Sequence, residues 1–261
     1  MKPSKVLYEE LLPHEFVAKV NKFPVAYLPL GTLEWHGKHL PLGADGIQAQ
    51  GIFKQLATLV GGVVLPMLFL GPDRKSETAQ GKVYYGMDLI SFEEQAPQQL
   101  VGNAYHVEDD FFLSLLHATL RNLSRAGFKV VVAHGHGPST NMYRENKNDF
   151  AQNFKLETFT LWDLGFEGTK GIQTDHAATN ETSLVMSLTP DLTDLARLSE
   201  DEIPIGVWGR DPRQFASQEE GARLIESNIQ SAAKKLELVV SNTSSPNLSL
   251  DYHSVKNLLE E

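Results

Sequence analysis

Residues 25–59 read VAYLPLGTLEWHGKHLPLGADGIQAQGIFKQLATL. The first six residues form an apolar run of strand length, and a loop rich in glycine, proline and polar residues follows it. From residue 46 to residue 59, apolar side chains return every three or four positions, which is the period of an amphipathic helix. This stretch therefore predicts a buried strand, a polar loop and a helix, in that order.

The same order recurs along the chain. Further apolar runs predict strands at 63–70, 129–133 and 156–162, and helical periodicity appears at 107–126, 141–154, 181–188 and 218–236. Because the strands lack polar alternation, both of their faces should be buried, as in a mostly parallel sheet with helices on each side. We expect an α/β fold, a three-layer α/β/α sandwich. The irregular segment 71–108 is expected to be a long excursion or a small β-rich insert, and 241–261 a polar tail with a short terminal helix.

Composition narrows the class of protein. The chain has 261 residues, a net charge of −10 and no cysteine, and no composition break divides it, so one domain over 1–261 is expected. The charge and the lack of a Lys/Arg run argue against nucleic acid as a partner. No stretch approaches the ~18 apolar residues of a membrane span, and the N-terminus lacks an apolar signal core, so we expect no membrane association and a cytoplasmic location.

The loop after the first strand carries potential metal ligands. Glu34 and His36 are two residues apart and project to the same side of an extended backbone, and Asp45 returns a carboxylate at the start of the next helix. A carboxylate can bridge two cations through its two oxygens. The alternative is that Glu34 and Asp45 are surface acids or helix caps and that the histidine is a satisfied polar residue.

Two later segments also carry potential metal ligands near the end of a strand or the start of a helix. His134 and His136 lie between glycines at the end of the strand 129–133, and Asp175, His176 and Glu181 lead into the helix 181–188. Thr179 or Asn180 could cap that helix, which is the structural explanation for part of the run. Ligands of open α/β sheets bind at the carboxyl ends of the strands, so one crevice is expected to collect all three clusters.

These clusters resemble the motifs of the creatininase family. The resemblance rests on LPLGTLEWHGKHLPLGAD (28–45), on GHG (135–137) with Asn141, on HAATNETS (176–183) and on GVWGRDP (206–212), in family order. It implies a metal-dependent amidohydrolase with two divalent ions per chain, Zn or Mn, with Fe or Mg also compatible. By motif position, Glu34 and His136 would bind one ion, His36 and Glu181 the other, and Asp45 would bridge them. His176 would be the catalytic proton shuttle, with Glu181 completing the reactive centre.

The resemblance also implies a substrate class. Family members cleave cyclic amides or formamides of small molecules, and one branch opens a carbocyclic inosose ketone, so ketone ring opening and a non-catalytic metal-binding subunit are the alternatives. Pro138 stands where creatininase has a further carboxylate and Ile172 where it has a tryptophan, so creatinine itself is not the expected substrate. By analogy a homo-oligomer, a hexamer, is expected. Candidates for orienting the ligands or lining the substrate pocket are Trp35, His39, His134, Asp175 and Tyr85.

Overall fold

A four-stranded parallel sheet forms the centre of the molecule. The computed structural model describes residues 5–92, 95–165 and 174–251, and the sheet order is β2 (Val63–Val64), β1 (Val25–Leu30), β7 (Val130–Gly135), β8 (Glu157–Thr160). Every residue of β1 and β7 is buried, as their unbroken apolar runs predict. The strand expected at 63–70 is wrong in length: β2 ends at Val64. Pro66 has no N–H to donate, and only Leu65 and Leu68 continue to donate to carbonyls of β1.

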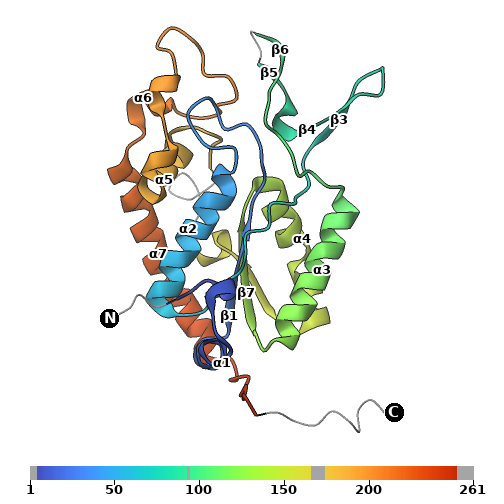
Figure 1. Cartoon of the computed structure of the whole chain (residues 1–261), viewed down its shortest axis with the longest axis vertical. Helices are drawn as coiled ribbons and strands as arrows, with labels where there is room; N and C mark the ends of the chain where they lie inside the picture. The colour runs from blue at the N-terminus through green and yellow to red at the C-terminus, as the bar shows by residue number, and fades with distance from the viewer. Residues whose placement is uncertain (1–4, 93–94, 166–173, 252–261) are drawn as a thin grey trace.

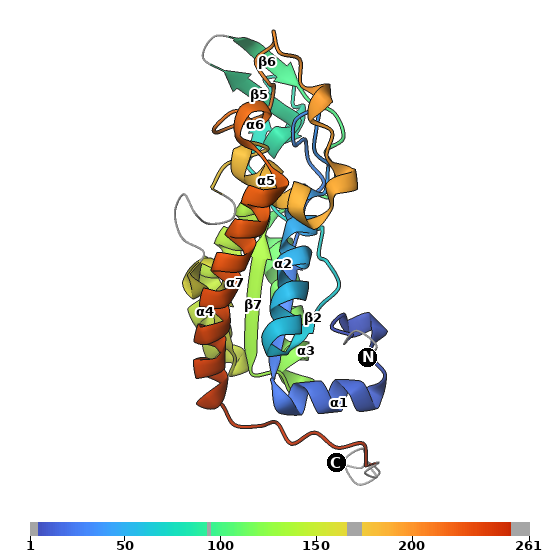
Figure 2. The same ribbon diagram turned by 90° about the vertical axis from the view of Figure 1, so that its left-hand side faces the viewer.

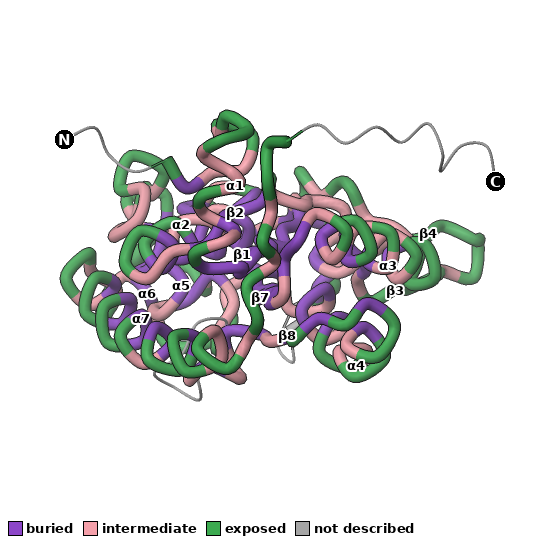
Figure 3. The backbone as a smooth tube through the Cα atoms, turned by 90° about the horizontal axis from the view of Figure 1, so that it is seen from below, coloured by how far each residue is buried: buried purple, intermediate pink, exposed green. Residues whose placement is uncertain are grey.

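Helices cover both faces of the sheet, so the expected three-layer α/β/α sandwich is confirmed (Figure 2). Side chains of β7 alternate between the two layers: Val130 and Val132 pack with one face, Val131 and Ala133 with the other. Buried residues concentrate along these central strands (Figure 3). The first layer holds α2 (Ala44–Val60), α5 (Thr179–Leu188) and α7 (Gln218–Ser241), and the second holds α3 (Asp109–Arg125), α4 (Gly137–Phe154) and α1 (Pro13–Lys22). Helix α1 was not among the elements expected from the sequence.

The segment 71–108 is a small β-rich insert, one of the two forms expected for it. It contains the antiparallel pairs β3 (Lys75–Glu77) with β4 (Val83–Tyr85) and β5 (Leu89–Phe92) with β6 (Gln95–Gln99). Both hairpins project beyond the end of the sheet (Figure 1). Isolated bridges join Leu33 to Ala104 and Gly71 to His106, so the insert lies against the loop that follows β1.

A short helix, α6 (Pro212–Phe215), precedes α7. The terminal helix expected within 241–261 falls mostly on residues 252–261, which lie outside the described residues. None of the helices in the described part of the chain is long and apolar enough to cross a bilayer.

Candidate metal centre

Five side chains from four separate segments meet beyond the carboxyl ends of β1 and β7. Because β1 and β7 are neighbours in parallel register, with Leu30 opposite Gly135, the loops that leave them start side by side. The backbone N–H of His136 donates to the carbonyl of Leu30. Gly135 has φ +149°, and a Cβ there would collide with that carbonyl, so this close turn requires glycine. All five side chains are nearly inaccessible: Glu34 3%, His36 0%, Asp45 5%, His136 2% and Glu181 1% exposed.

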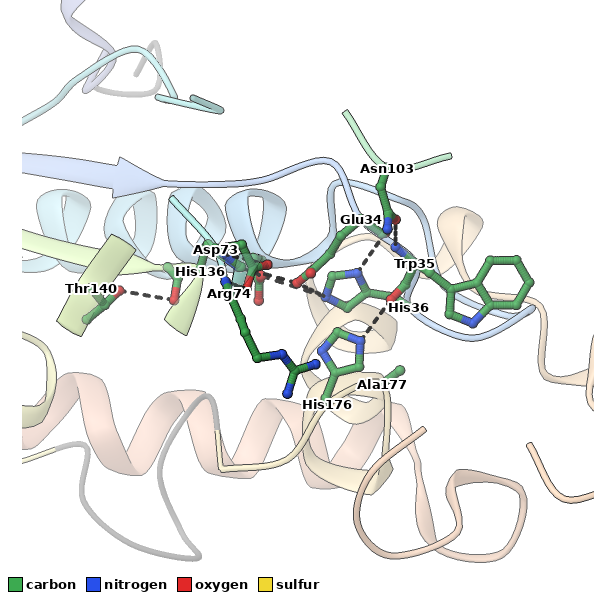
Figure 4. Close-up of polar contacts among 12 residues, drawn as sticks. Glu34, Trp35, His36, Asp73, Arg74, Asn103, His136, Thr140, His176 and Ala177 are labelled. Atoms are coloured by element: carbon green, nitrogen blue, oxygen red, sulfur yellow. Dashed lines mark hydrogen bonds and ion pairs between the residues drawn. The ribbon is translucent and has the colours of Figure 1, made fainter. Parts of the chain in front are cut away.

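The five side chains form two groups that share the Asp45 carboxylate, and a further possible group joins Glu34 and His36 to His176. Of these residues, Figure 4 labels Glu34, His36, His136 and His176, whose side chains gather in one region. In the first group, His136 Nδ1 lies 3.3 Å from Glu34 Oε1 and 3.1 Å from Asp45 Oδ2. In the second, His36 Nε2 lies 3.7 Å from Asp45 Oδ2 and 3.7 Å from Glu181 Oε1. The Asp45 carboxylate thus lies between the two ligand sets, with Oδ2 within 4 Å of a histidine of each, so this side chain is within reach of both.

The spacing and the donor atoms fit divalent ions. Ligands about 2.1 Å from a tetrahedral Zn²⁺ lie about 3.4 Å from one another, and the four contacts above bracket that value. Imidazole nitrogen and carboxylate oxygen together accept zinc, manganese, iron or magnesium. His36 Nε2 is buried and has no hydrogen-bond partner among the described residues, so it is a donor atom free to bind an ion.

The carboxylates create a strong field for positive charge. Burial by itself would lower the pKa of His36, but the carboxylates of Glu181, Asp45 and Glu34 outweigh it and raise that pKa to about 10. Burial is likewise outweighed at His136, where Glu34 and Asp45 raise the pKa well above its usual value. Burial raises the pKa of Glu181 to about 8. In the metal-free protein, protons therefore occupy the places where cations would bind.

Other polar groups hold the ligands in orientation. His36 Nδ1 lies 3.1 Å from the carbonyl of Glu34; an N–H donated there leaves the Nε2 lone pair directed at the carboxylates. Gln48 Nε2 donates to Glu181 Oε1 at 2.7 Å, and the N–H of Ala177 donates to the other oxygen. The Asp175 carboxylate accepts the N–H groups of Asn180 and Glu181 and so caps the first turn of α5, which carries Glu181.

His176 stands beside this cluster. Its ring centroid is 4.4 Å from that of His36, and its Nε2 lies 2.8 Å from the carbonyl of Trp35. That hydrogen bond assigns the proton to Nε2 and leaves Nδ1 with a lone pair. Burial, followed by the charge of His36, lowers the pKa of His176, so this imidazole is neutral at pH 7.

Asp73 is a site residue that the sequence argument missed. Its Oδ2 lies 3.5 Å from His136 Nε2, the nitrogen opposite to the one that faces Asp45, and the carbonyl of Pro72 is 3.3 Å from the same atom. Carboxylates in this position orient ligating histidines and raise their basicity. Asp73 follows Gly71 and Pro72 at the start of the insert, so its place after an apolar run was the available signal.

A cavity of about 250 Å³ opens onto the cluster. Of the pocket residues expected from the sequence, Asp175 lines it, whereas Trp35, His39, His134 and Tyr85 do not. Its described lining is Glu34, Asp45, Asp73, Arg74, Gly86, Met87, His136, Gly137, Pro138, Asp175, His176 and Trp208.

The other four residues expected to line the pocket make contacts elsewhere in the structure. Trp35 packs with Met87, Ile90 and Leu100, and its ring points away from the cluster (Figure 4). His39 Nε2 lies 2.9 Å from the hydroxyl of Thr182. His134 meets the ring of Trp162 edge-on, and neither of its ring nitrogens has a hydrogen-bond partner in the described part of the chain. Tyr85 stacks on His106 and donates to Glu108; the next two residues, Gly86 and Met87, reach the cavity instead.

Comparisons with known proteins agree with this geometry. The family model of creatininase, described as creatinine amidohydrolase, matches residues 9–236. A creatinine amidohydrolase of Pseudomonas putida is 26% identical over 263 residues, covering 87% of this chain and 95% of that protein.

Solved structures show the same fold. A crystal structure of creatinine amidohydrolase (creatininase) has a TM-score of 0.67 at 23% identity and covers 90% of this chain and 97% of its own. A creatininase described as the manganese form has a TM-score of 0.62 at 24% identity, with 90% and 98% covered. A mutant creatininase of zinc–zinc type has a TM-score of 0.64 at 23% identity, with 90% and 99% covered. The family match spans most of the chain, and the chain therefore belongs to the creatininase family of amidohydrolases.

Proposed function

We propose that this enzyme holds two divalent ions, Zn²⁺ or Mn²⁺, and hydrolyses a C–N amide bond of a small molecule other than creatinine. The observation that carries the proposal is the position of Asp45 Oδ2, 3.1 Å from His136 Nδ1 and 3.7 Å from His36 Nε2. Glu34 and His136 would hold one ion, His36 and Glu181 the other, and Asp45 would bridge them. The zinc and manganese forms among the structural neighbours support these two metals.

Bound ions would supply a water of lowered pKa and a positive field at the substrate carbonyl. The protein side chains would then manage the proton. His176 is neutral, and its Nε2–H is anchored to the carbonyl of Trp35, so Nδ1 is the atom able to take up a proton and pass it to the leaving nitrogen. The anchor fixes the ring beside His36, one of the residues that would hold an ion.

The cavity lining supports a substrate other than creatinine. Pro138 lines the cavity at the motif position where creatininase carries a further carboxylate, so the side chain at this position offers no acceptor for a guanidine-like group. The other position that departs from creatininase, Ile172, lies outside the described residues. The volume of about 250 Å³ is below the ~300–1,000 Å³ typical of sites for drug-sized ligands, so the substrate should be small.

The proposal is tested by metal content and turnover together. Chelated protein is reloaded with Mn²⁺ or Zn²⁺, ions per chain are counted, and hydrolysis is measured on formamides, lactams and inososes. We expect about two ions per chain and turnover of amides; Asp45→Asn should lose both ions and the activity.

Asp149→Asn is the matched control, because Asp149 also contacts a histidine, His117 at 3.5 Å, but on the surface. Turnover of inososes without amides would replace amide hydrolysis by ketone ring opening. Full activity of Asp45→Asn would refute the site.

A further inference from the structure

Arg74 gives the cavity a feature that the proposed reaction does not use. Four carboxylates line the cavity, and Arg74 is the one arginine or lysine among its described lining residues. Its side chain extends toward the part of the site where His176 lies (Figure 4), and both residues line the cavity. A cationic group at this place would face the substrate.

The guanidinium has no ion-pair partner within the part of the chain that the structure describes. The adjacent residue shows the contrast: Lys75 Nζ lies 3.0 Å from Glu108 Oε1 and is paired on the surface. Two of the other arginines are also paired, Arg213 with Asp211 at 2.7 Å and Arg223 with Glu220 at 2.6 Å. Arg74 therefore keeps its planar set of N–H donors available for an external carboxylate, which it can bind in bidentate fashion.

The backbone of Arg74 is held in a fixed relation to the metal centre. Its N–H donates to Asp73 Oδ1 at 2.6 Å, while Asp73 Oδ2 faces His136. Its carbonyl accepts the N–H of Gly86 at 2.8 Å, at the start of the β3–β4 pair. Gly86 has φ +47°, and a Cβ there would strike the Asp73 carboxylate, so the close approach of Gly86 to Asp73 requires glycine at this position. One aspartate thus contacts both His136 and the backbone of Arg74.

We infer that Arg74 selects substrates that carry a carboxylate on the amine side of the amide bond, such as N-acylated amino acids or lactams bearing an acid group. The inference rests on the proposed function and names its substrate class. The amine side follows because Arg74 shares the cavity with His176, the group that would protonate the leaving nitrogen, and its side chain extends in the direction of that residue (Figure 4). In the reaction, the carbonyl carbon gains the oxygen of water, and the C–N bond breaks. The nitrogen keeps the bonding pair and takes a proton through His176, while the distant carboxylate stays unchanged on Arg74.

Matched pairs of amides test this inference. N-formylglycine is compared with N-formylethanolamine, and pyroglutamate with pyroglutaminol, so that only the carboxylate is exchanged for a neutral hydroxymethyl group. Wild-type, Arg74→Gln, Arg74→Lys and Lys75→Gln proteins are used with metal content verified. Lys75→Gln removes the same charge one residue away from the cavity and is the control for a general field effect.

We expect the wild-type and Lys75→Gln proteins to prefer the acids by about 10- to 100-fold in kcat/KM, mainly through KM, as befits one charge-assisted pair. Arg74→Gln should reduce the preference to within about threefold, with Arg74→Lys in between. A preference that survives in Arg74→Gln, or that Lys75→Gln loses equally, overturns the inference.

Calorimetric measurement of how tightly the same four compounds bind distinguishes the role of Arg74 from the proposal of amide hydrolysis. If the loaded wild-type protein hydrolyses none of the four compounds, amide hydrolysis of this class fails, but the dissociation constants still decide the role of Arg74. A carboxylate can also bind the ions directly, so the decisive quantity is the difference between wild-type and Arg74→Gln proteins. Equal acid preference in both overturns the inference, and a preference at least about tenfold larger in the wild type supports it.

Discussion

Metal loading at pH 7 should release about three protons from the protein. In the metal-free state, the raised pKa values of His36, about 10, and of His136, well above its usual range, keep both imidazoles protonated at this pH. The pKa of Glu181, about 8, keeps most of that carboxyl protonated as well. Each of these groups must lose its proton to become a ligand, so two ions entering the cluster should displace about three protons.

The number of protons released on metal loading should fall as the pH rises. At pH 9, above the pKa of about 8 of Glu181, that carboxyl is already ionised in the metal-free protein, so fewer protons should be released than at pH 7. Ionisation of a bound water would add to both values and cannot reduce them.

Calorimetric titration of chelated protein with Zn²⁺ or Mn²⁺, in two buffers of different ionisation enthalpy, measures this release. His36→Gln should bind one ion fewer and release fewer protons. His117→Gln, which alters a surface histidine paired with Asp149, should behave as the wild type does. A release below about one proton per chain at pH 7 would refute the assignment, because the imidazoles would then be neutral and outside the field of the carboxylates.

Three further outcomes follow from the same geometry. Asp73→Asn should weaken metal binding by about 10- to 100-fold, since His136 loses the carboxylate that orients it; direct metal titration measures this, and unchanged affinity would exclude the role. His176→Gln should lower kcat by about 10²- to 10⁴-fold at unchanged metal content, and a fall in ions per chain would instead make His176 a ligand. Chelated protein should lose stability as the pH rises from 7 toward 10, by up to about 1.4 kcal/mol per pH unit for each proton held only by the folded state. The sign follows because the folded pKa of His36, about 10, exceeds its unfolded value of 6.5; thermal melts that are flat over this range in chelated protein would contradict it.

Local patterns of apolar residues in the sequence were sufficient to predict the layers of the fold. The apolar run at 25–30 and the helical period after it predicted β1 and α2, because burial on both faces and burial on one stripe leave different periods in a sequence. The parallel sheet followed from the lack of polar alternation. The length of β2 did not follow, because one proline outweighed the apolar character of 63–70. Helix α1 was missed although its apolar side chains do return at helical spacing.

The metal cluster was also predictable in part. Glu34, His36, Asp45, His136 and Glu181 follow strands or begin helices, and the parallel topology alone requires such positions to meet at one edge of the sheet. The lining of the cavity could not be derived in this way. Tyr85 was expected there, but Gly86 and Met87 are the residues that reach it, because a hairpin far from the motifs folds over the cluster.

The chain by itself thus determined most of the elements and the candidate ligands of the centre, because both depend on short-range spacing and residue chemistry. Only the tertiary structure decided that Asp73 faces His136, that Trp35 turns away to hold His176 through its carbonyl, and that Arg74 extends over the cavity. These placements arise from packing between distant segments, such as the contacts of His136 with Pro72 and of His176 with Trp35, which are 64 and 141 residues apart. No local period in the sequence records contacts of that range.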